Sequence, residues 1–316
     1  MQIALITALI VVAVLVALYV NGGAYVAHAR KRWPALGRFI ESDNARIHIV
    51  EHGPADSPRL LLLHGANGNL REMLGPFEAL KSDHRIIAMD RPGAGYSTAR
   101  NGHEIATQAR HAAQILEATG GPAIIVAHSL GSAVALRLAH DRPDLVRGMV
   151  LIAPFAQPYD LKHSWWTNLA ATPLIGHVFA STLVPILGPV IGRASIANIF
   201  WPAPVSKDFY DEAGVGLAFC PTAFVSNART IVGTRAAFAA QAPLYSEILA
   251  PTVIVTADKD RVISPKRHAR ALAEHLPAVE LVTAPGAGHV PHRVRNDLVI
   301  AAIRRVETMA ALSDAR

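Results

Sequence analysis

The stretch AIIVAHSLGSAVALR, residues 123–137, decides the fold of this chain. Its first five residues are apolar, as in a buried strand, whereas residues 132–139 are rich in Ala and Leu, as in a helix. Small residues at Ala127 and Gly131 leave room for a sharp turn, the G-x-S-x-G pattern with Ala in the first glycine position. The pattern predicts that Ser129 stands at a helix N-terminus, where a developing negative charge is favoured. An ordinary serine N-cap is the alternative that the rest of the chain must decide.

The same order of apolar strand, loop and helix occurs three times between residues 60 and 152. Such repeats form a parallel sheet with crossover helices, so we expect an α/β fold with helices on both faces of the sheet. The expected strands are residues 60–63, 85–89, 123–127, 148–152, 252–256 and 279–283, with two shorter strands around a turn at 43–44 within residues 38–52.

Residues 157–244 interrupt this order and are rich in Pro, Trp, Phe and Leu. Helical stretches are expected at residues 165–171, 175–186 and 230–240. The segment is therefore predicted to be a helical cap inserted into a core made of residues 36–156 and 245–316. Because a cap covers the mouth of the sheet, some of its apolar side chains are expected to line an apolar substrate pocket.

The composition excludes several classes of protein. Hydrophobic residues make up 51% of the chain and charged residues 17%, which excludes a disordered chain. The net charge of +6 comes from scattered arginines without a basic run, so we expect a solvated surface and no binding of nucleic acid. The single cysteine, Cys220, excludes an internal disulfide and a multi-cysteine metal site.

Residues 3–20 form an apolar run, and no Asp, Glu, Lys or Arg precedes Arg30. At 1.5 Å per residue the run spans roughly 27 Å, close to the hydrocarbon thickness of a bilayer. We therefore expect residues 1–35 to comprise a transmembrane anchor, which contacts lipid through residues 3–20, and a basic linker. Tyr19, Tyr25 and Trp33 are expected at the membrane interface.

The cluster of cations after this run predicts that the C-terminal domain lies on the cytoplasmic side. The alternative is a signal peptide cleaved near residues 27–29, with export of the rest. Two features disfavour a signal peptide: no basic n-region precedes the apolar run, and the run is longer than usual for such peptides.

Ser129 needs a base, which a histidine can supply, and an acid that orients the imidazole. His289 follows a glycine-rich loop at the end of an expected strand, and Asp260 follows another strand. These residues are the predicted nucleophile, acid and base, in the order Ser, Asp, His. Asp258 stays open as the acid and His292 as the base.

The glycine-rich loop at residues 64–68 follows the first core strand and leaves backbone N–H groups free. We expect the amides of Ala66 and Leu130 to form the oxyanion hole. Asp90 is interpreted as a structural residue that ties down the next loop. The candidate substrate-binding residues are His64, Asn67, Trp165 and Trp166.

These motifs resemble those of the α/β-hydrolase superfamily, in the cap-bearing group that includes esterases, lipases, C–C bond hydrolases and haloperoxidase-like enzymes. The matching segments are His64-Gly65-x-x-Gly68, Asp90-Arg91-Pro92-Gly93-x-Gly95-Tyr96-Ser97, the elbow at 127–131, and the segments that carry Asp260 and His289. The resemblance covers roughly residues 36–312 and implies the α/β-hydrolase fold. Serine at position 129 argues against a haloalkane dehalogenase or an epoxide hydrolase, because similar enzymes with those activities carry Asp there.

The sequence thus predicts a serine hydrolase that cleaves apolar carboxylic esters, lipid-derived esters included, through an acyl-enzyme on Ser129. His289 would act as base and then as acid, and Asp260 would orient it. No metal ion or organic cofactor is required. Two alternatives remain: a C–C bond hydrolase that uses the same residues, and a ligand-binding protein in which they are idle.

Overall fold

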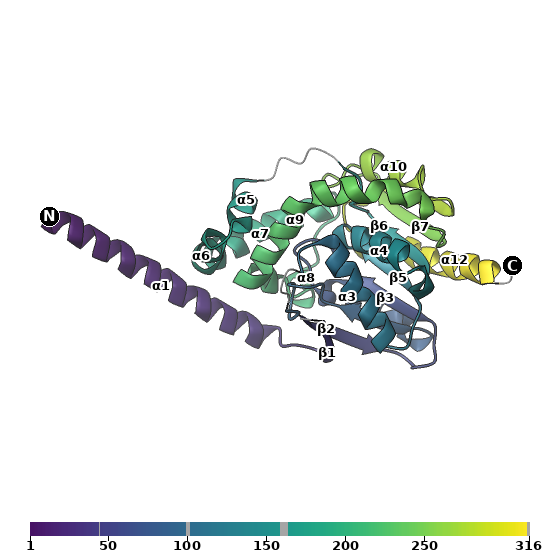
Figure 1. Cartoon of the computed structure of the whole chain (residues 1–316), viewed down its shortest axis with the longest axis horizontal. Coiled ribbons are helices and arrows are strands. Elements are labelled where there is room, and N and C mark those ends of the chain that lie inside the picture. The colour runs from purple at the N-terminus through teal and green to yellow at the C-terminus, as the bar shows by residue number, and fades with distance from the viewer. Residues whose placement is uncertain (44, 99–101, 159–163, 315–316) are drawn as a thin grey trace.

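An eight-stranded sheet with the order β1-β2-β4-β3-β5-β6-β7-β8 forms the centre of the computed structural model, which describes residues 1–43, 45–98, 102–158 and 164–314 (Figure 1). β1 and β2 form an antiparallel hairpin, β2 pairs antiparallel with β4, and the strands from β3 onward are parallel. The strands are β1 (Arg38–Ser42), β2 (Ala45–His52), β3 (Arg59–Leu63), β4 (Arg85–Met89), β5 (Ala123–His128), β6 (Val146–Ile152), β7 (Thr252–Ala257) and β8 (Val279–Ala284). The mostly parallel α/β sheet is therefore confirmed.

Helices cover both faces of this sheet, and the strand side chains alternate between them. Leu61 and Leu63 of β3 belong to the apolar core under α3 (Ile105–Ala118) and α4 (Leu130–Asp141). Leu60 and Leu62 pack in the opposite core. That core lies under α2 (Leu70–Phe77) and α12 (Asn296–Asp314). The strands β3 to β7 are buried on both faces, which is why they read as continuous apolar runs, whereas the edge strands β1 and β8 are partly exposed. Shorter helical segments are η1 (Glu78–Ser82), η2 (Pro143–Leu145), η4 (Ala242–Glu247), η5 (Lys266–Arg270), α10 (Ala271–Ala273) and α11 (Pro291–Val294).

The insertion between β6 and β7 is helical. It contains α5 (Trp165–Ala171), α6 (Ile175–Thr182), α7 (Val184–Phe200), α8 (Phe209–Glu212), η3 (Val215–Phe219) and α9 (Pro221–Gln241). The single helix expected at residues 175–186 is wrong, because the chain bends by 74° between α6 and α7. Pro185 explains the break, since a proline ring inside a helix clashes with the carbonyl four residues earlier.

The first helix, α1 (Gln2–Arg32), is long and apolar enough to cross a membrane, and its most apolar window is not buried in the rest of the protein. Figure 1 shows its N-terminal part projecting alone from the body. The basic residues expected in a linker form its last turn, where cations are favoured by the helix dipole. Tyr25 and Trp33 engage the cap, because the Tyr25 hydroxyl donates to Gly216 O (2.9 Å) and Trp33 Nε1 donates to Asp211 O (2.9 Å).

Candidate active site

Ser129 stands at a strained turn between β5 and α4. Its φ of 50° and ψ of −117° lie in a region that non-glycine residues rarely adopt. The amide of Ser129 donates to Ile152 O (2.9 Å), which ties the turn to β6. A Cβ atom at Gly131 would lie 2.6 Å from Leu63 O, so only glycine fits there. The small residues of the sequence pattern therefore have a steric cause.

Three predicted residues from three loops meet above the sheet. The distance from Ser129 Oγ to His289 Nε2 is 3.0 Å, and the distance from His289 Nδ1 to Asp260 Oδ2 is 2.7 Å. The second carboxylate oxygen of Asp260 accepts hydrogen bonds from the amides of Val262 (2.8 Å) and Ile263 (2.9 Å). With the carboxylate accepting at Nδ1, the free lone pair of the imidazole is at Nε2, facing the serine hydroxyl.

The alternative acid and base lie elsewhere. Asp258 accepts a hydrogen bond from the amide of Gly286 (2.7 Å), which fixes the loop ahead of His289. His292 is buried against Glu72 and has no described contact with Ser129. The structure therefore brings Asp260 and His289 to Ser129, and gives Asp258 a loop-fixing role.

The electrostatic setting suits a base and its orienting acid. Burial lowers the pKa of His289 below its usual value, although Asp260 partly opposes this shift. Burial alone would raise the pKa of Asp260, but the hydrogen bond from His289 and the two backbone amides hold it below its usual value. At neutral pH the imidazole is therefore unprotonated and the carboxylate ionised, as proton abstraction from serine requires.

The expected oxyanion donors are close to Ser129 in the chain or in space: Leu130 follows it directly, and Ala66 follows Gly65, at which a Cβ atom would lie 3.2 Å from Ser129 Cβ. Leu130 is the first residue of α4, where N–H groups have no intrahelical acceptor. Among the described residues, nothing accepts a hydrogen bond from the amide of Ala66 or Leu130. Asn67, next to Ala66, adopts φ 53° and is held by the cap: its amide donates to Asn227 Oδ1 (2.8 Å), and Asn227 Nδ2 donates to Asn67 Oδ1 (2.6 Å).

The predicted substrate contact at His64 is wrong. Its ring is fully buried, with Nδ1 donating to Gly65 O (2.8 Å) and Nε2 accepting from the amide of Arg91 (3.0 Å). Burial lowers the pKa of His64 to about 4. The residue orders the oxyanion loop and has no nitrogen left for a ligand.

The two tryptophans suggested for substrate binding lie on the outside of the cap. Trp165 is 67% exposed and Trp166 is 40% exposed. Their described ring contacts are with each other and, for Trp165, with Phe179 of α6. The structure does not bring them to Ser129, because α5 turns this face toward solvent. Asp90, by contrast, is structural as predicted, since it accepts hydrogen bonds from the amides of Leu70 and Tyr96.

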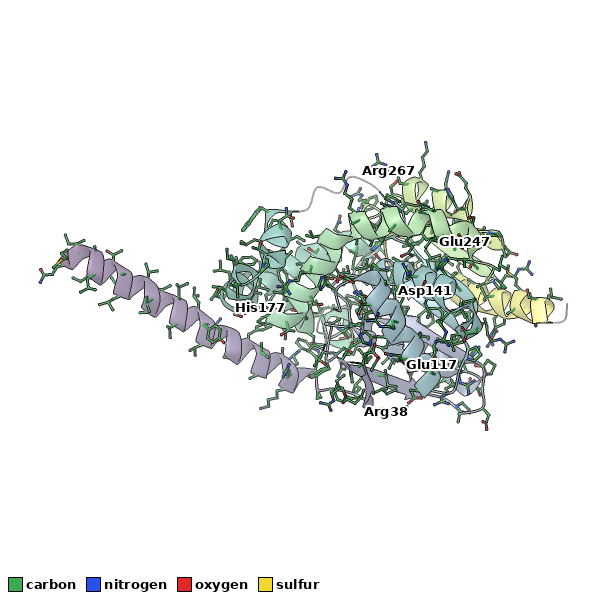
Figure 2. All side chains as sticks on the ribbon, viewed as in Figure 1. Arg38, Glu117, Asp141, His177, Glu247 and Arg267 are labelled. Carbon is green, nitrogen blue, oxygen red and sulfur yellow. The ribbon has the colours of Figure 1, made fainter. Side chains whose placement is uncertain are left out.

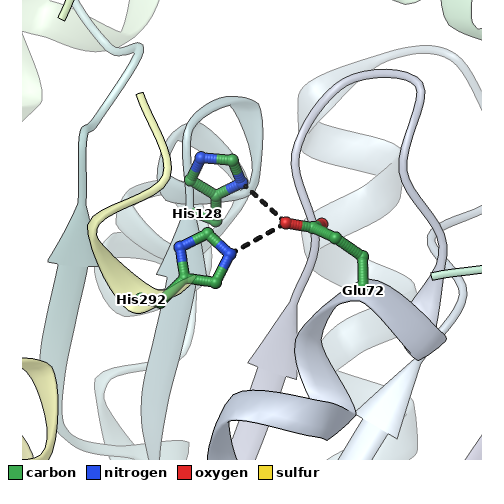
Figure 3. A group of neighbouring side chains, drawn as sticks. All are labelled: Glu72, His128 and His292. Atoms are coloured by element: carbon green, nitrogen blue, oxygen red, sulfur yellow. Dashed lines mark hydrogen bonds and ion pairs between the residues drawn. The ribbon is translucent and has the colours of Figure 1, made fainter. Parts of the chain in front are cut away.

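A buried cluster beside His289 was not predicted from the sequence (Figure 3). Glu72 Oε1 lies 2.9 Å from His292 Nε2 and 3.4 Å from His128 Nδ1, and His128 Nε2 is 2.9 Å from the backbone oxygen of His289. Burial would raise the pKa of Glu72, but the two histidines hold it well below its usual value. The cluster fixes the backbone of His289 through the contact of His128 Nε2 with its carbonyl oxygen.

These three side chains are also near enough to one another to hold a metal ion. Among the described residues, one possible ligand atom from each of them lies within 4.8 Å of the other two. Within it, one hydrogen bond engages the carboxylate, between Glu72 Oε1 and His292 Nε2, whereas His128 Nδ1 has no hydrogen-bond partner among the described residues. No sequence signal pointed to it, because Glu72 lies in the first turn of α2, where acidic residues are common for reasons of helix capping.

The cap closes over the site and holds its base. The amide of His289 donates to Ile199 O in α7 (2.8 Å), and a Cβ atom at Gly288 would overlap the carbonyl of Trp201. Ser129 and His289 are each only 5% exposed. The site is therefore screened from bulk water, which strengthens its electrostatic interactions.

Comparisons with known proteins agree with this architecture. A model of the alpha/beta hydrolase fold matches residues 58–294. The chain is 32% identical over 252 residues to a putative carbamate hydrolase, RutD, of Variovorax paradoxus, covering 77% of this chain and 89% of that protein. The crystal structure of a membrane phospholipase A aligns with a TM-score of 0.69 at 20% identity and covers 98% of this chain and 99% of that one. The enol-lactonase from Burkholderia xenovorans LB400 aligns with a TM-score of 0.71 at 19% identity, over 85% of this chain and 99% of that one. The chain belongs to the α/β-hydrolase fold family.

Proposed function

We propose that this protein is a membrane-anchored serine hydrolase that cleaves carboxylic esters of apolar substrates. The observation that carries the proposal is the hydrogen-bonded series of Ser129, His289 and Asp260. An idle, ligand-binding member of the fold has no need for this geometry, nor for a base whose pKa is lowered by burial.

The geometry supports a two-step acyl transfer. Ser129 Oγ attacks the ester carbonyl while His289 Nε2 takes its proton, and the developing oxyanion accepts hydrogen bonds from the amides of Ala66 and Leu130. His289 then donates the proton to the leaving alcohol, which leaves an acyl-enzyme. Water, deprotonated by His289, attacks this ester and releases the carboxylic acid and free Ser129.

The anchor supports a substrate that partitions into membranes. Helix α1 has the length and composition of a transmembrane span, and the solved structure that aligns over 98% of this chain is that of a membrane phospholipase A. We place the catalytic domain on the cytoplasmic side because Arg30, Lys31 and Arg32 follow the apolar run. Protease accessibility in intact cells and in spheroplasts tests this orientation.

A fluorophosphonate probe tests the nucleophile. We expect the probe to label the full chain and not Ser129→Ala, and the substitution to lower kcat by at least about 10⁴-fold. Labelling that persists in Ser129→Ala would overturn the assignment. A panel of aryl esters of increasing acyl length, with an aryl carbamate and a C–C cleavable diketone beside it, then defines the bond that is cleaved.

A further inference from the structure

The cap carries an exposed apolar surface that the active site does not use. We name it the cap ridge; it consists of Leu174, Ile175, Val178, Leu183, Ile186, Leu187, Val190 and Ile191. Their exposed fractions run from 40% to 83%. Large contiguous apolar patches are rare on soluble monomers and mark binding surfaces.

The chain around the cap ridge contains one titratable side chain, His177, and is otherwise uncharged. Residues 164–192 contain no Asp, Glu, Lys or Arg. The bent pair α6 and α7 has together the length and composition of a membrane span, although neither helix is long enough alone. A helix that is apolar on all sides is stable when buried in protein or in lipid, and the cap ridge is not buried in protein. Figure 2 shows His177 at this end of the molecule, whereas Arg38, Glu117, Asp141, Glu247 and Arg267 lie on the body.

The cap ridge lies beside the helix that has the properties of a span. A Cβ atom at Gly22 of α1 would overlap the carbonyl oxygen of Ser181 and would lie 3.6 Å from a side-chain carbon of Pro185, so α1 touches the junction of α6 and α7. The uncharged part of α1 extends to Ala29. At 1.5 Å per residue this part is longer than the roughly 30 Å hydrocarbon layer. Its C-terminal end, which would extend beyond that layer, is the part that contacts the cap. Figure 1 shows α6 and α7 beside the C-terminal part of α1, so an anchor that spans the bilayer with its N-terminal part would bring the cap ridge to the level where α1 leaves the bilayer.

Cations border the cap ridge where lipid headgroups would lie. A cavity of about 570 Å³ between α1 and α7 is lined by Arg32, Arg193 and Lys207, among others. Asp211 lines the same cavity and pairs with Arg32 at 2.7 Å. Among the described residues, Arg193 and Lys207 have no carboxylate partner within 4 Å. An apolar surface bordered by unpaired cations complements the acyl chains and phosphates of a leaflet, and does not complement a second copy of the same basic border.

We propose that the cap ridge inserts into the leaflet from which α1 emerges, so that the enzyme is held on the membrane by its cap as well as by its anchor. The inference rests on the proposed role of α1 as an anchor. Because α7 begins in the cap ridge and ends at the carbonyl that holds His289, the inserted surface and the catalytic base lie at opposite ends of one helix.

Depth-dependent quenching on the full chain in nanodiscs tests the proposal, with one protein per disc. Single cysteines at Val178 and Leu187, in a Cys220→Ala background, carry an environment-sensitive fluorophore. Val12 in α1 is the matched lipid-exposed site. Leu249, which is 74% exposed and follows Glu247 on the body, is the matched aqueous site (Figure 2). Equal rates of fluorophosphonate labelling show that each variant is folded.

We expect labels at positions 178 and 187 to be quenched several-fold more by nitroxide on the acyl chains than by aqueous iodide, as at position 12. The label at position 249 should show the reverse. The labels at 178 and 187 could instead be quenched by iodide as strongly as the label at 249, while the label at position 12 is quenched by lipid. That result would overturn the insertion of the cap ridge and would leave the proposed anchor unaffected. Protection from both quenchers would mean that protein covers the ridge, which also overturns the proposal. Failure of lipid quenching at position 12 would overturn the anchor and the cap ridge together, while fluorophosphonate labelling of Ser129 would still report on the chemistry.

Discussion

At the scale of single residues, the two carboxylates that follow β7 show how closely spaced groups acquire different roles. Asp260 faces His289 and is buried, whereas Asp258 fixes the amide of Gly286. The sequence pattern predicted Asp260 as the acid and kept Asp258 as the alternative, because each follows the same strand. The backbone of the loop decides between them by presenting the amides of Val262 and Ile263 to the second oxygen of Asp260.

We expect Asp260→Asn to reduce kcat by about 10⁴-fold, because the amide no longer stabilises the imidazolium or fixes its tautomer. Asp258→Asn should change kcat by less than about tenfold and cost about 1 kcal/mol of stability, since the bond from Gly286 weakens. Steady-state kinetics on one aryl ester and thermal unfolding of both variants measure these effects. Equal kinetic losses would contradict the assignment of the acid.

At the scale of elements, the strands were predictable and the breaks between helices were not. Apolar runs at β3 to β7 reflect burial on both sheet faces, which leaves a direct mark on the sequence. The bend between α6 and α7 depends on Pro185, in a segment that is apolar throughout and therefore shows no helical period. Helix α9 starts at Pro221, nine residues before the expected position. Polar residues in this first part of the helix obscure its apolar period in the sequence.

The candidate site was likewise predictable only in part. Ser129, Asp260 and His289 stand at strand ends that short motifs reveal. The cluster of Glu72, His128 and His292 joins α2, β5 and α11, and no local pattern encodes a contact among three elements. The engagement of His64 with the backbone is hidden for the same reason.

Two adjacent glycines in α1 give a matched test of its packing against the cap. A Cβ atom at Gly22 would overlap Ser181 O, whereas one at Gly23 would meet nothing within 4 Å. We expect Gly22→Ala to destabilise the protein by roughly 1–3 kcal/mol, as overpacking does, and Gly23→Ala to leave stability unchanged or slightly raised. Thermal unfolding in detergent measures both. A neutral Gly22→Ala would mean that α1 does not pack on α6.

At the scale of the whole molecule, buried histidines make stability depend on pH. Burial lowers the pKa values of His64, His268 and His292 to about 4 each, against about 6.5 in an unfolded chain. Between these values the unfolded chain binds protons that the folded chain does not, so the free energy of unfolding falls as pH falls from about 6.5 to about 4.

We therefore expect the Tm to drop by several degrees or more between pH 7.5 and pH 4.5. His292→Gln removes one of the three groups and should make the drop smaller. Differential scanning calorimetry of both proteins in the same detergent measures the difference. A Tm that is constant or rises toward pH 4.5 would contradict the burial of neutral imidazoles.

The hydrogen bond from His289 N to Ile199 O joins a core residue to an inserted one. Caps are commonly regarded as exchangeable modules, with substrate range in the insertion and chemistry in the core. In this chain the two are not separable, because the insertion supplies the acceptor for the amide of the catalytic base. A chimaera that replaced residues 157–244 would leave that amide buried without a partner, at a cost of about 1–3 kcal/mol, unless the new cap offered a carbonyl at the same point. A change of cap that alters substrate range is therefore constrained where the inserted segment meets His289.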